Sequence, residues 1–199
     1  EIEYGYSALK ADGISMTTSY QGKLISEPMF EPVLAELNRR KSVVFAHPQT
    51  ISRDRSMNTR VLEMPYDTGR AILDMVVRGN FKKYPNIRWI FAHGGGALPI
   101  LWERAEEITA KTPDKPLAAG IRTVLKDLHF DVIGVANKLD FQLVAGLWGT
   151  DRLTFGTDWP FVQAKTTAGN FDALGLSAAD AYKINRGNAE KLFPRLAKA

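Results

Sequence analysis

Three apolar runs, each leading to a residue that can bind a metal or transfer a proton, constrain the fold of this chain more than any other feature. The runs cover residues 43–46, 87–92 and 153–157, and they lead to His47, His93 and Asp158. Runs rich in β-branched and aromatic residues, bounded by turn signals, are typical of buried strands. Three glycines after His93 let the backbone turn sharply beside the imidazole. The sequence therefore predicts three buried strands that each end in a chemically active side chain.

Helical patterns separate these strands, which predicts an α/β fold with a parallel sheet. In a barrel of parallel strands and outer helices, the carboxyl ends of the strands open into one mouth, where the chemistry takes place. We therefore expect His47, His93 and Asp158 to converge on one cation site. The alternative is that each is a polar residue satisfied at its own strand end, which is the commoner situation for a single such residue.

Five strands are predicted in total, around Ile14, Val43, Ile87, Val132 and Leu153. A closed barrel of this kind has eight strands and usually needs about 250 residues. The chain has 199 residues, which is enough for one domain with a sizeable core or for part of a larger one. The count therefore predicts an incomplete barrel.

Amphipathic patterns place helices between the strands, including one at residues 67–78 and one from Pro116 to Leu128. The residues after the glycine turn, from Leu98 to Ile108, also have helical spacing. Near the end of the chain, Ser177 is predicted to cap one helix and Asn188 to cap the last.

A long irregular segment, residues 49–65, follows His47. It carries Arg53, Asp54, Arg55 and Arg60. A loop of this length at the carboxyl edge of a sheet is typical of a lid or a substrate-contacting segment. Its arginines are candidates for binding a substrate carboxylate, and solvated loop charges are the alternative.

Composition excludes several classes of function. The chain has no cysteine, so disulfides and thiolate sites are excluded. Its formal charge of +4 comes from dispersed basic residues, which does not favour nucleic-acid binding. No apolar stretch is long enough to span a bilayer and no signal peptide opens the chain, so we expect no membrane partner and a cytoplasmic location. The first residue is Glu1 rather than methionine, which suggests a piece of a longer gene product.

Two further polar residues lie near the strand predicted at residues 130–133. His129 precedes this strand, at the end of a barrel that usually contributes stability, so we expect a structural role for it. Asp131 is harder to assign, because it could face the barrel interior and support the site from behind.

Several motifs together resemble the amidohydrolase superfamily. They are His47-Pro48, His93-Gly94-Gly95-Gly96 with Leu98-Pro99, Gly156-Thr157-Asp158-Trp159-Pro160, and Asn188-Ala189 with Leu192-Phe193. More narrowly, they resemble the branch that contains aminocarboxymuconate-semialdehyde decarboxylase and the aromatic-acid decarboxylases. The segments at residues 9–13 and 35–40 are similar to enzymes of the methylsalicylate decarboxylase type. The resemblance covers essentially the whole chain and leaves the substrate open.

The resemblance implies a distorted (β/α)₈ barrel with one divalent metal at its mouth, zinc first and manganese as the second candidate. His47 and Asp158 would be metal ligands, and His93 would lie beside the metal and orient water or relay a proton. Arg104 occupies the place of a family arginine that enters the partner subunit's site, which implies a homodimer. The catalytic residues implied are thus His93, Asp158 and Arg104.

One departure from the family is serious. The family's first strand carries a His-x-His pair that supplies two more metal ligands, whereas the histidines of this chain are His47, His93 and His129. The five predicted strands correspond to the family's fourth to eighth. We therefore expect residues 1–199 to form a single domain that is the C-terminal part of a barrel. Because a catalytic zinc usually has three protein ligands, we also expect this chain alone to hold metal weakly.

Imidazole and carboxylate groups suit zinc or manganese, and such a metal can bind the oxygens of a substrate as a Lewis acid. The resemblance favours decarboxylation of a small aromatic or muconate-type carboxylic acid, in which Asp158 or His93 supplies a proton. The same residues could instead activate a metal-bound water that hydrolyses a lactone or amide. Two further alternatives are a phosphate cradle at the glycine turn and an inactive fragment that lacks the His-x-His ligands.

Overall fold

The computed structural model describes residues 1–49, 59–111 and 120–198. The predictions made for Arg53, Asp54 and Arg55, and for residues 116–119 of the helix expected from Pro116 to Leu128, fall outside these described residues. The described part of that expected helix contains a helix at Ile121–Leu125.

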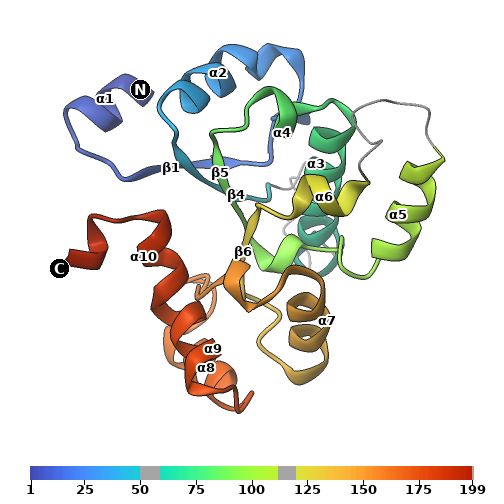
Figure 1. Ribbon diagram of the computed structural model, residues 1–199, viewed down its shortest axis with the longest axis vertical. Helices are drawn as coiled ribbons and strands as arrows, with labels where there is room; N and C mark the ends of the chain where they lie inside the picture. The colour runs from blue at the N-terminus through green and yellow to red at the C-terminus, as the bar shows by residue number, and fades with distance from the viewer. Residues whose placement is uncertain (50–58, 112–119, 199) are drawn as a thin grey trace.

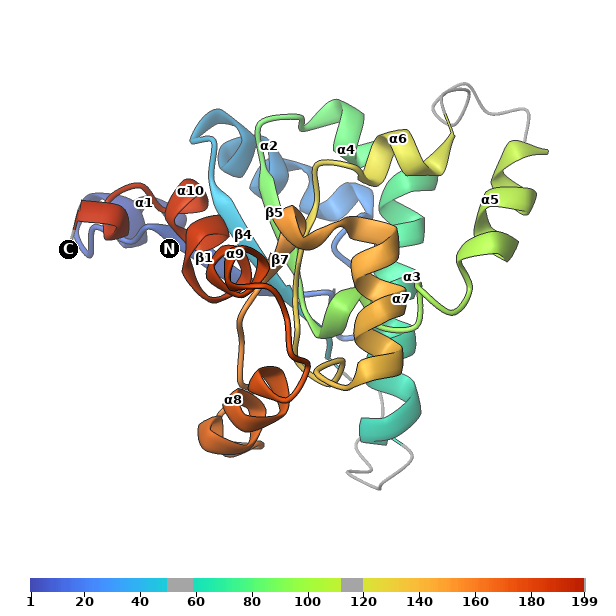
Figure 2. The ribbon, with the colours of Figure 1, turned by 60° about the horizontal axis from the view of Figure 1, so that its bottom comes forward.

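A five-stranded parallel sheet forms the centre of the molecule (Figures 1 and 2). Its strands, in spatial order, are β1 (Gly13–Thr17), β4 (Val43–His47), β5 (Arg88–Phe91), β6 (His129–Asp131) and β7 (Leu153–Thr154). Every neighbouring pair is parallel, so all five carboxyl ends lie at one edge of the sheet. The prediction of five parallel strands alternating with helices is confirmed.

Ten α-helices accompany this sheet within the described residues. They are α1 (Ile2–Ser7), α2 (Glu31–Arg39), α3 (Met64–Val77), α4 (Asn80–Lys83), α5 (Trp102–Ala110), α6 (Ile121–Leu125), α7 (Lys138–Trp148), α8 (Ala164–Asp172), α9 (Ala178–Tyr182) and α10 (Asn188–Leu192). The red helices α9 and α10 lie together, whereas the orange helix α8 lies apart from them in Figure 2. A short antiparallel hairpin, β2 (Ser19–Tyr20) with β3 (Lys23–Leu24), was not predicted.

The two faces of the sheet pack against different parts of the chain. On one face, Trp89 and Phe91 of β5 and Phe130 of β6 join a large apolar core with the helices. On the other face, Val43 and Ile90 pack with Leu192 of α10 in a smaller cluster that also contains Phe45 and Phe193. Burial on both faces explains why these strands are nearly continuous apolar runs rather than alternating ones.

The strand that leads to Asp158 is shorter than predicted, because β7 ends at Thr154. The next residue, Phe155, donates its N–H to the carbonyl of Ile184, so the chain leaves the sheet toward the C-terminal helices. The prediction that Asp158 is the last residue of a strand is therefore wrong. Asp158 lies in the loop that follows β7.

Ser177 caps α9 as predicted, since its hydroxyl accepts the N–H of Asp180 at 3.1 Å. The prediction that Asn188 caps the last helix is wrong. Asn188 is buried as the first residue of α10, and its Nδ2 donates to the carbonyls of Thr150 and Leu153 at 2.8 Å each. Its side chain therefore ties α10 to the end of β7 instead of satisfying its own helix.

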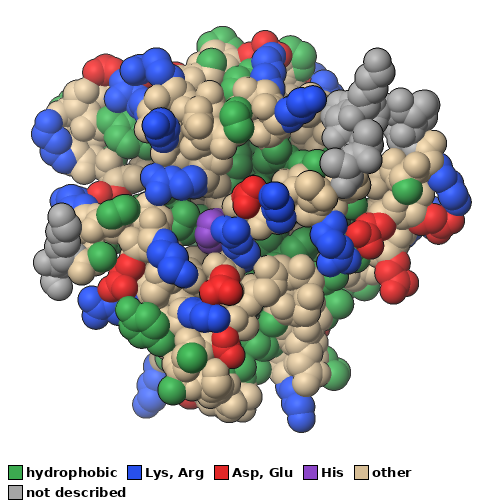
Figure 3. All heavy atoms as spheres, in the orientation of Figure 1, with side chains coloured by type: hydrophobic (Ala, Val, Ile, Leu, Met, Phe, Trp, Pro, Cys, Tyr) green, Lys and Arg blue, Asp and Glu red, His purple; other side chains and the backbone are tan. Residues whose placement is uncertain are grey.

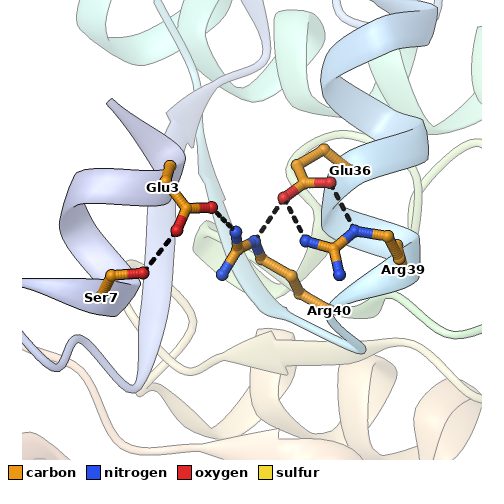
Figure 4. Close-up of polar contacts among 5 residues, drawn as sticks. All are labelled: Glu3, Ser7, Glu36, Arg39 and Arg40. Atoms are coloured by element: carbon orange, nitrogen blue, oxygen red, sulfur yellow. Dashed lines mark hydrogen bonds and ion pairs between the residues drawn. The ribbon is translucent and has the colours of Figure 1, made fainter.

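A group of charged side chains joins α1 to α2 (Figure 4). Arg40 donates through Nε to Glu36 at 2.5 Å and through Nη2 to Glu3, and its side chain is only 15% exposed. Ser7 donates to the same Glu3 carboxylate at 2.6 Å, and Arg39 pairs with Glu36 from the exposed side. These contacts hold the first helix of the chain against the second.

Acidic and basic side chains are interspersed over the face in Figure 3, with hydrophobic side chains visible between them. Among the described residues, the helices are too short or too polar to cross a membrane.

Candidate metal centre

The carboxyl edge of the sheet brings three candidate ligands together. His47 is the last residue of β4, His93 follows β5 by two residues, and Asp158 lies in the loop after β7. One ligand atom from each residue can be chosen so that all three lie within 4.8 Å of one another. His47 Nε2 is 3.6 Å from Asp158 Oδ1, and the two imidazole centres are 5.2 Å apart. The predicted convergence of these residues is confirmed.

Two of these residues have an unusual backbone. His93 has φ = 58° and Asp158 has φ = 57°, in the left-handed region that side chains other than glycine seldom adopt. Such conformations persist only where the surrounding structure enforces them, and they concentrate at functional sites. Lys10, Gln21 and Lys41 share such a φ away from the cluster, so the significance of His93 and Asp158 rests on the convergence of their side chains.

The three glycines after His93 are required by close packing. Residues 93–95 form a 3₁₀ turn in which Gly94 has φ = 62°, and Gly96 follows with φ = 65°. A Cβ at Gly96 would lie 2.2 Å from the carbonyl oxygen of Pro65 at the start of α3. This turn is not the start of a helix, because α5 begins only at Trp102, later than predicted. A phosphate cradle at a helix N-terminus therefore lacks the helix it requires.

The tautomer of His47 is fixed by its neighbour. Its Nδ1 lies 2.9 Å from the carbonyl oxygen of Pro48, and a carbonyl can only accept, so Nδ1 carries the proton. The lone pair is then on Nε2, the nitrogen that faces Asp158. An Nδ1–H bonded to a backbone carbonyl is the usual arrangement behind a metal-binding Nε2.

His93 is more enclosed than His47. Burial, and then the proximity of His47, lower its pKa to about 4, against the opposing effect of the Asp158 carboxylate. The imidazole is therefore neutral near pH 7, as a metal ligand must be. Its Nδ1 is buried and has no hydrogen-bond partner among the described residues. A neutral, unpartnered imidazole beside another imidazole and a carboxylate fits a zinc or manganese ion.

Asp131 lies behind the cluster, at the end of β6. Its Oδ1 accepts the backbone N–H groups of His93 at 2.7 Å and Ile133 at 3.1 Å. Burial raises the pKa of this carboxyl group to about 7, although both N–H contacts act in the opposite direction. The expectation that Asp131 could support the site from behind agrees with these contacts.

A cavity of about 1000 Å³ opens over the cluster. His47, His93 and Asp158 contribute to its wall, and most of the remaining wall is apolar. That wall includes Val61, Leu62, Ile100, Ile133, Val135, Leu143, Val144 and Phe161. Among the described residues of the wall, Arg60 is the one lysine or arginine. Such a cavity can hold a small organic molecule with an anionic group.

The family model for amidohydrolases matches residues 1–195 of the chain. This chain belongs to the amidohydrolase family. A 6-methylsalicylic acid decarboxylase of Penicillium expansum is 31% identical over 98% of the chain and 64% of its own length. A decarboxylase of Penicillium terrestre is 30% identical over 98% of the chain and 63% of its own length. The chain thus spans just under two thirds of these curated relatives.

Solved structures agree with this assignment. The 5-carboxyvanillate decarboxylase of Novosphingobium aromaticivorans, complexed with manganese and 4-hydroxy-3-methoxy-5-nitrobenzoic acid, superimposes with a TM-score of 0.83 at 25% identity. The match covers 97% of this chain and 59% of that structure. The five parallel strands and their helices thus form an α/β, TIM-like arrangement that corresponds to part of an amidohydrolase fold.

Two residues of this amidohydrolase chain lie away from the cluster. Arg104 is exposed on α5 and is not among the described residues that line the cavity, so its function in a partner's site stays a prediction. His129 is buried at the start of β6, where it pairs in register with Ile90 and contacts Arg152 at 3.5 Å. Burial, followed by the charge of Arg152, lowers its pKa to about 4. Its position agrees with the structural role predicted for it.

Much of the wall of this amidohydrolase cavity was not foreseen. Leu143 and Val144 belong to α7, and Phe161 follows Asp158 by three residues. Their apolar character gave no indication of a ligand, because the same residues would be expected in any buried position. Arg60 was the one lining residue predicted from its charge.

Proposed function

We propose that this chain is the C-terminal, metal-binding part of a metal-dependent decarboxylase that acts on a small aromatic or muconate-type carboxylic acid. The observation that carries the proposal is the convergence of His47, His93 and Asp158 at the wall of a largely apolar cavity. The decarboxylases of aromatic acids among the similar proteins support the choice of reaction.

His47 and Asp158 are the proposed metal ligands, with zinc as the first candidate and manganese as the second. The manganese in the similar 5-carboxyvanillate decarboxylase supports the second candidate as well. A bound metal supplies Lewis-acid polarisation of the substrate's oxygens. His47 presents its Nε2 lone pair, since Nδ1–H is engaged by Pro48.

In decarboxylation, the ring carbon that bears the carboxylate gains a proton, the carbon–carbon bond to the carboxylate breaks, and its electron pair restores the ring as carbon dioxide leaves. Asp158 and His93 are the residues placed to hold or move that proton. His93, neutral because burial lowers its pKa to about 4, would relay a proton or orient water without carrying a lasting positive charge. The apolar wall formed by Ile133, Val144 and Phe161 would exclude water from the ring.

We further propose that residues 1–199 form a single domain equivalent to the fourth to eighth strands of the barrel. A His-x-His pair outside this sequence would complete the metal site, and the chain alone would bind metal weakly. A homodimer in which Arg104 enters the partner's cavity, and a cytoplasmic location, belong to the same proposal.

The test compares this chain with a version extended at its N-terminus by a segment that carries a His-x-His pair. Both are loaded with Zn²⁺ or Mn²⁺ and assayed for carbon dioxide release from 6-methylsalicylate and from other hydroxybenzoates. We expect release that depends on metal and is lost in His47→Ala and Asp158→Asn, whereas the exposed-carboxylate control Asp151→Asn retains it. Hydrolysis of lactones or amides without carbon dioxide release would assign the site to the alternative reaction. Absence of metal binding by both proteins would contradict the metal centre itself.

A further inference from the structure

We propose that Asp131 is a positioning residue of the metal centre, which holds the backbone of His93 and the loop of Asp158 in place. This inference rests on the proposed metal-binding function. Asp131 ends β6, the strand between β5, which leads to His93, and β7, which leads to Asp158. One side chain is therefore adjacent to both segments that carry candidate ligands.

The first contact is with His93. Asp131 Oδ1 accepts the His93 N–H at 2.7 Å and the Ile133 N–H at 3.1 Å, so one oxygen links the residues just beyond two neighbouring strands. Backbone hydrogen bonds to a buried carboxylate are stronger than those between neutral groups. Because His93 has a left-handed backbone (φ = 58°), this bond helps to hold a conformation that the residue would otherwise leave.

The second contact is with the loop of Asp158. A Cβ at Gly156 would lie 3.3 Å from Cβ of Asp131 and 3.5 Å from its Oδ2. The chain leading to Asp158 can therefore pass this close to Asp131 because residue 156 has no side chain. Asp131 thus limits how far the Asp158 loop can move toward β6.

Asp131 is neither a ligand nor a substrate contact in this arrangement. It is not among the residues that converge within ligand distance, and it is not among the described residues of the cavity wall. Its exposed fraction is 6%, and its Oδ1 already accepts two hydrogen bonds. Its effect on a bound metal therefore passes through Asp158, a proposed ligand, and through His93, which lies within ligand distance of Asp158 and His47.

The test is a Co²⁺ titration, followed by visible absorption, of the chain and of the version extended by a His-x-His segment. Asp131→Asn keeps an acceptor of the same shape, Asp131→Leu removes the acceptor, and Asp127→Asn is the matched control from the exposed approach to the same strand. Loss of a group that orients a ligand typically weakens metal affinity by about 10- to 100-fold. We expect a loss of this size in Asp131→Leu, a smaller loss in Asp131→Asn, and none in Asp127→Asn.

Amide hydrogen exchange gives a second readout that does not depend on activity. In Asp131→Leu the amides of His93 and Ile133 should exchange faster, while those of β4 keep their rates. If the leucine variant does not fold, Asp131→Ser is used in its place. The serine side chain is too short for its hydroxyl to reach both N–H groups, so we expect the same faster exchange and the same loss of Co²⁺ affinity. Equal Co²⁺ affinity in the wild type and in Asp131→Leu would overturn the positioning role of Asp131 but leave the proposed metal centre intact. Absence of Co²⁺ binding in the wild type would overturn the metal centre and this inference together.

Discussion

At the scale of single residues, the candidate site depends on backbone conformations that most side chains avoid. His93 and Asp158 are left-handed, and the glycine turn between β5 and α5 has positive φ at Gly94, Gly95 and Gly96. Two of these positions have close neighbours on other elements, namely Asp131 beside His93 and Pro65 beside Gly96. Substitutions at these positions should therefore act on stability and on the site together.

Gly96→Ala should lower the free energy of unfolding by about 3 kcal/mol or prevent folding. The new Cβ would collide with the carbonyl oxygen of Pro65. In addition, the backbone conformation of residue 96 (φ = 65°, ψ = −127°) is one that almost only glycine adopts. The control is Gly146→Ala in α7, because a Cβ at this position meets nothing within 4 Å. Since alanine favours a helix more than glycine does, this substitution should raise the free energy of unfolding by about 0.5–1 kcal/mol. Urea unfolding of both variants measures the difference. Similar effects at the two positions would contradict the packing of the turn on α3.

Sequence reasoning located the three candidate ligands because each follows an apolar run, and this pattern is visible without any knowledge of tertiary contacts. It could not assign Asp131, since the decisive contacts are with backbone N–H groups of His93 and Ile133, and backbone groups leave no mark in a sequence. It also could not show that Asp158 lies beyond the end of β7. That ending results from the contact of Phe155 with Ile184, which is distant along the chain.

At the scale of elements, polar side chains help to fasten two of the helices to the rest of the molecule. Helix α1 has no buried residue, and it is held through Glu3 to Arg40 beside α2 (Figure 4). Helix α10 is tied to the end of β7 by Asn188. The contact between Arg40 and Glu3 is exposed on the Glu3 side, whereas the contact of Asn188 with Leu153 is buried. Loss of the buried contact should therefore lower the free energy of unfolding more than loss of the exposed one.

Arg40→Ala should free α1 from the rest of the molecule. The side chain of Arg40 is 15% exposed and bridges Glu3 and Glu36. Its guanidinium carbon also lies 5.2 Å from the centre of the Tyr6 ring. The side chain of Arg39, by contrast, is 65% exposed and pairs with Glu36 but not with Glu3. Amide exchange in α1 should accelerate by about fivefold in Arg40→Ala and by less than about twofold in Arg39→Ala. Equal rates in the two variants would show that the bridge does not hold the helix.

Asn188→Ala should cost about 2 kcal/mol of the free energy of unfolding, because the buried carbonyl of Leu153 loses the Asn188 donor. The carbonyl of Thr150 also loses a donor, although it still accepts the backbone N–H of Leu153. Asn137→Ala is the matched control, since Asn137 caps α7 at an exposed position, and it should cost about 1 kcal/mol. Chemical denaturation of both variants provides the comparison. A smaller loss for Asn188→Ala than for the control would contradict this account of how α10 is attached.

The elements themselves were largely predictable. The five strands and helix α7 agree with their apolar patterns, since burial on one or both faces determines those patterns. The hairpin of β2 and β3 was missed because two-residue strands carry too little periodicity. Asn188 was misread because a cap and a buried donor require the same residue type, and only the carbonyls of Thr150 and Leu153 distinguish the two uses.

At the scale of the whole molecule, stability should depend on pH through His129. Its pKa is lowered to about 4 in the folded protein, first by burial and then by Arg152, against an ordinary value of 6.5. Between these values the unfolded chain binds the proton and the folded chain does not. Stability should therefore fall as the pH drops from about 6.5 to about 4 and level off below, with a contribution of at most about 3 kcal/mol.

His129→Gln should remove this part of the pH dependence. Urea midpoints at pH 7 and pH 4.5, measured for the wild type and the variant without metal, should differ less in the variant. His93 also titrates in this range, and it is retained in both proteins, so the comparison isolates His129. An unchanged pH dependence in the variant would show that His129 is protonated as easily in the folded as in the unfolded state.

The strand order has a consequence for how relatives of this chain could diverge. The separation of His47 from His93 follows from two neighbouring parallel strands, and the distance between such strands is set by backbone hydrogen bonds rather than by side chains. The walls of the cavity come instead from connections such as Thr59–Glu63 and the segment around Phe161. Insertions and substitutions there can change the shape of the cavity while the ligand spacing stays fixed. Ligand spacing and cavity shape are thus encoded in separate parts of the polypeptide and can evolve independently.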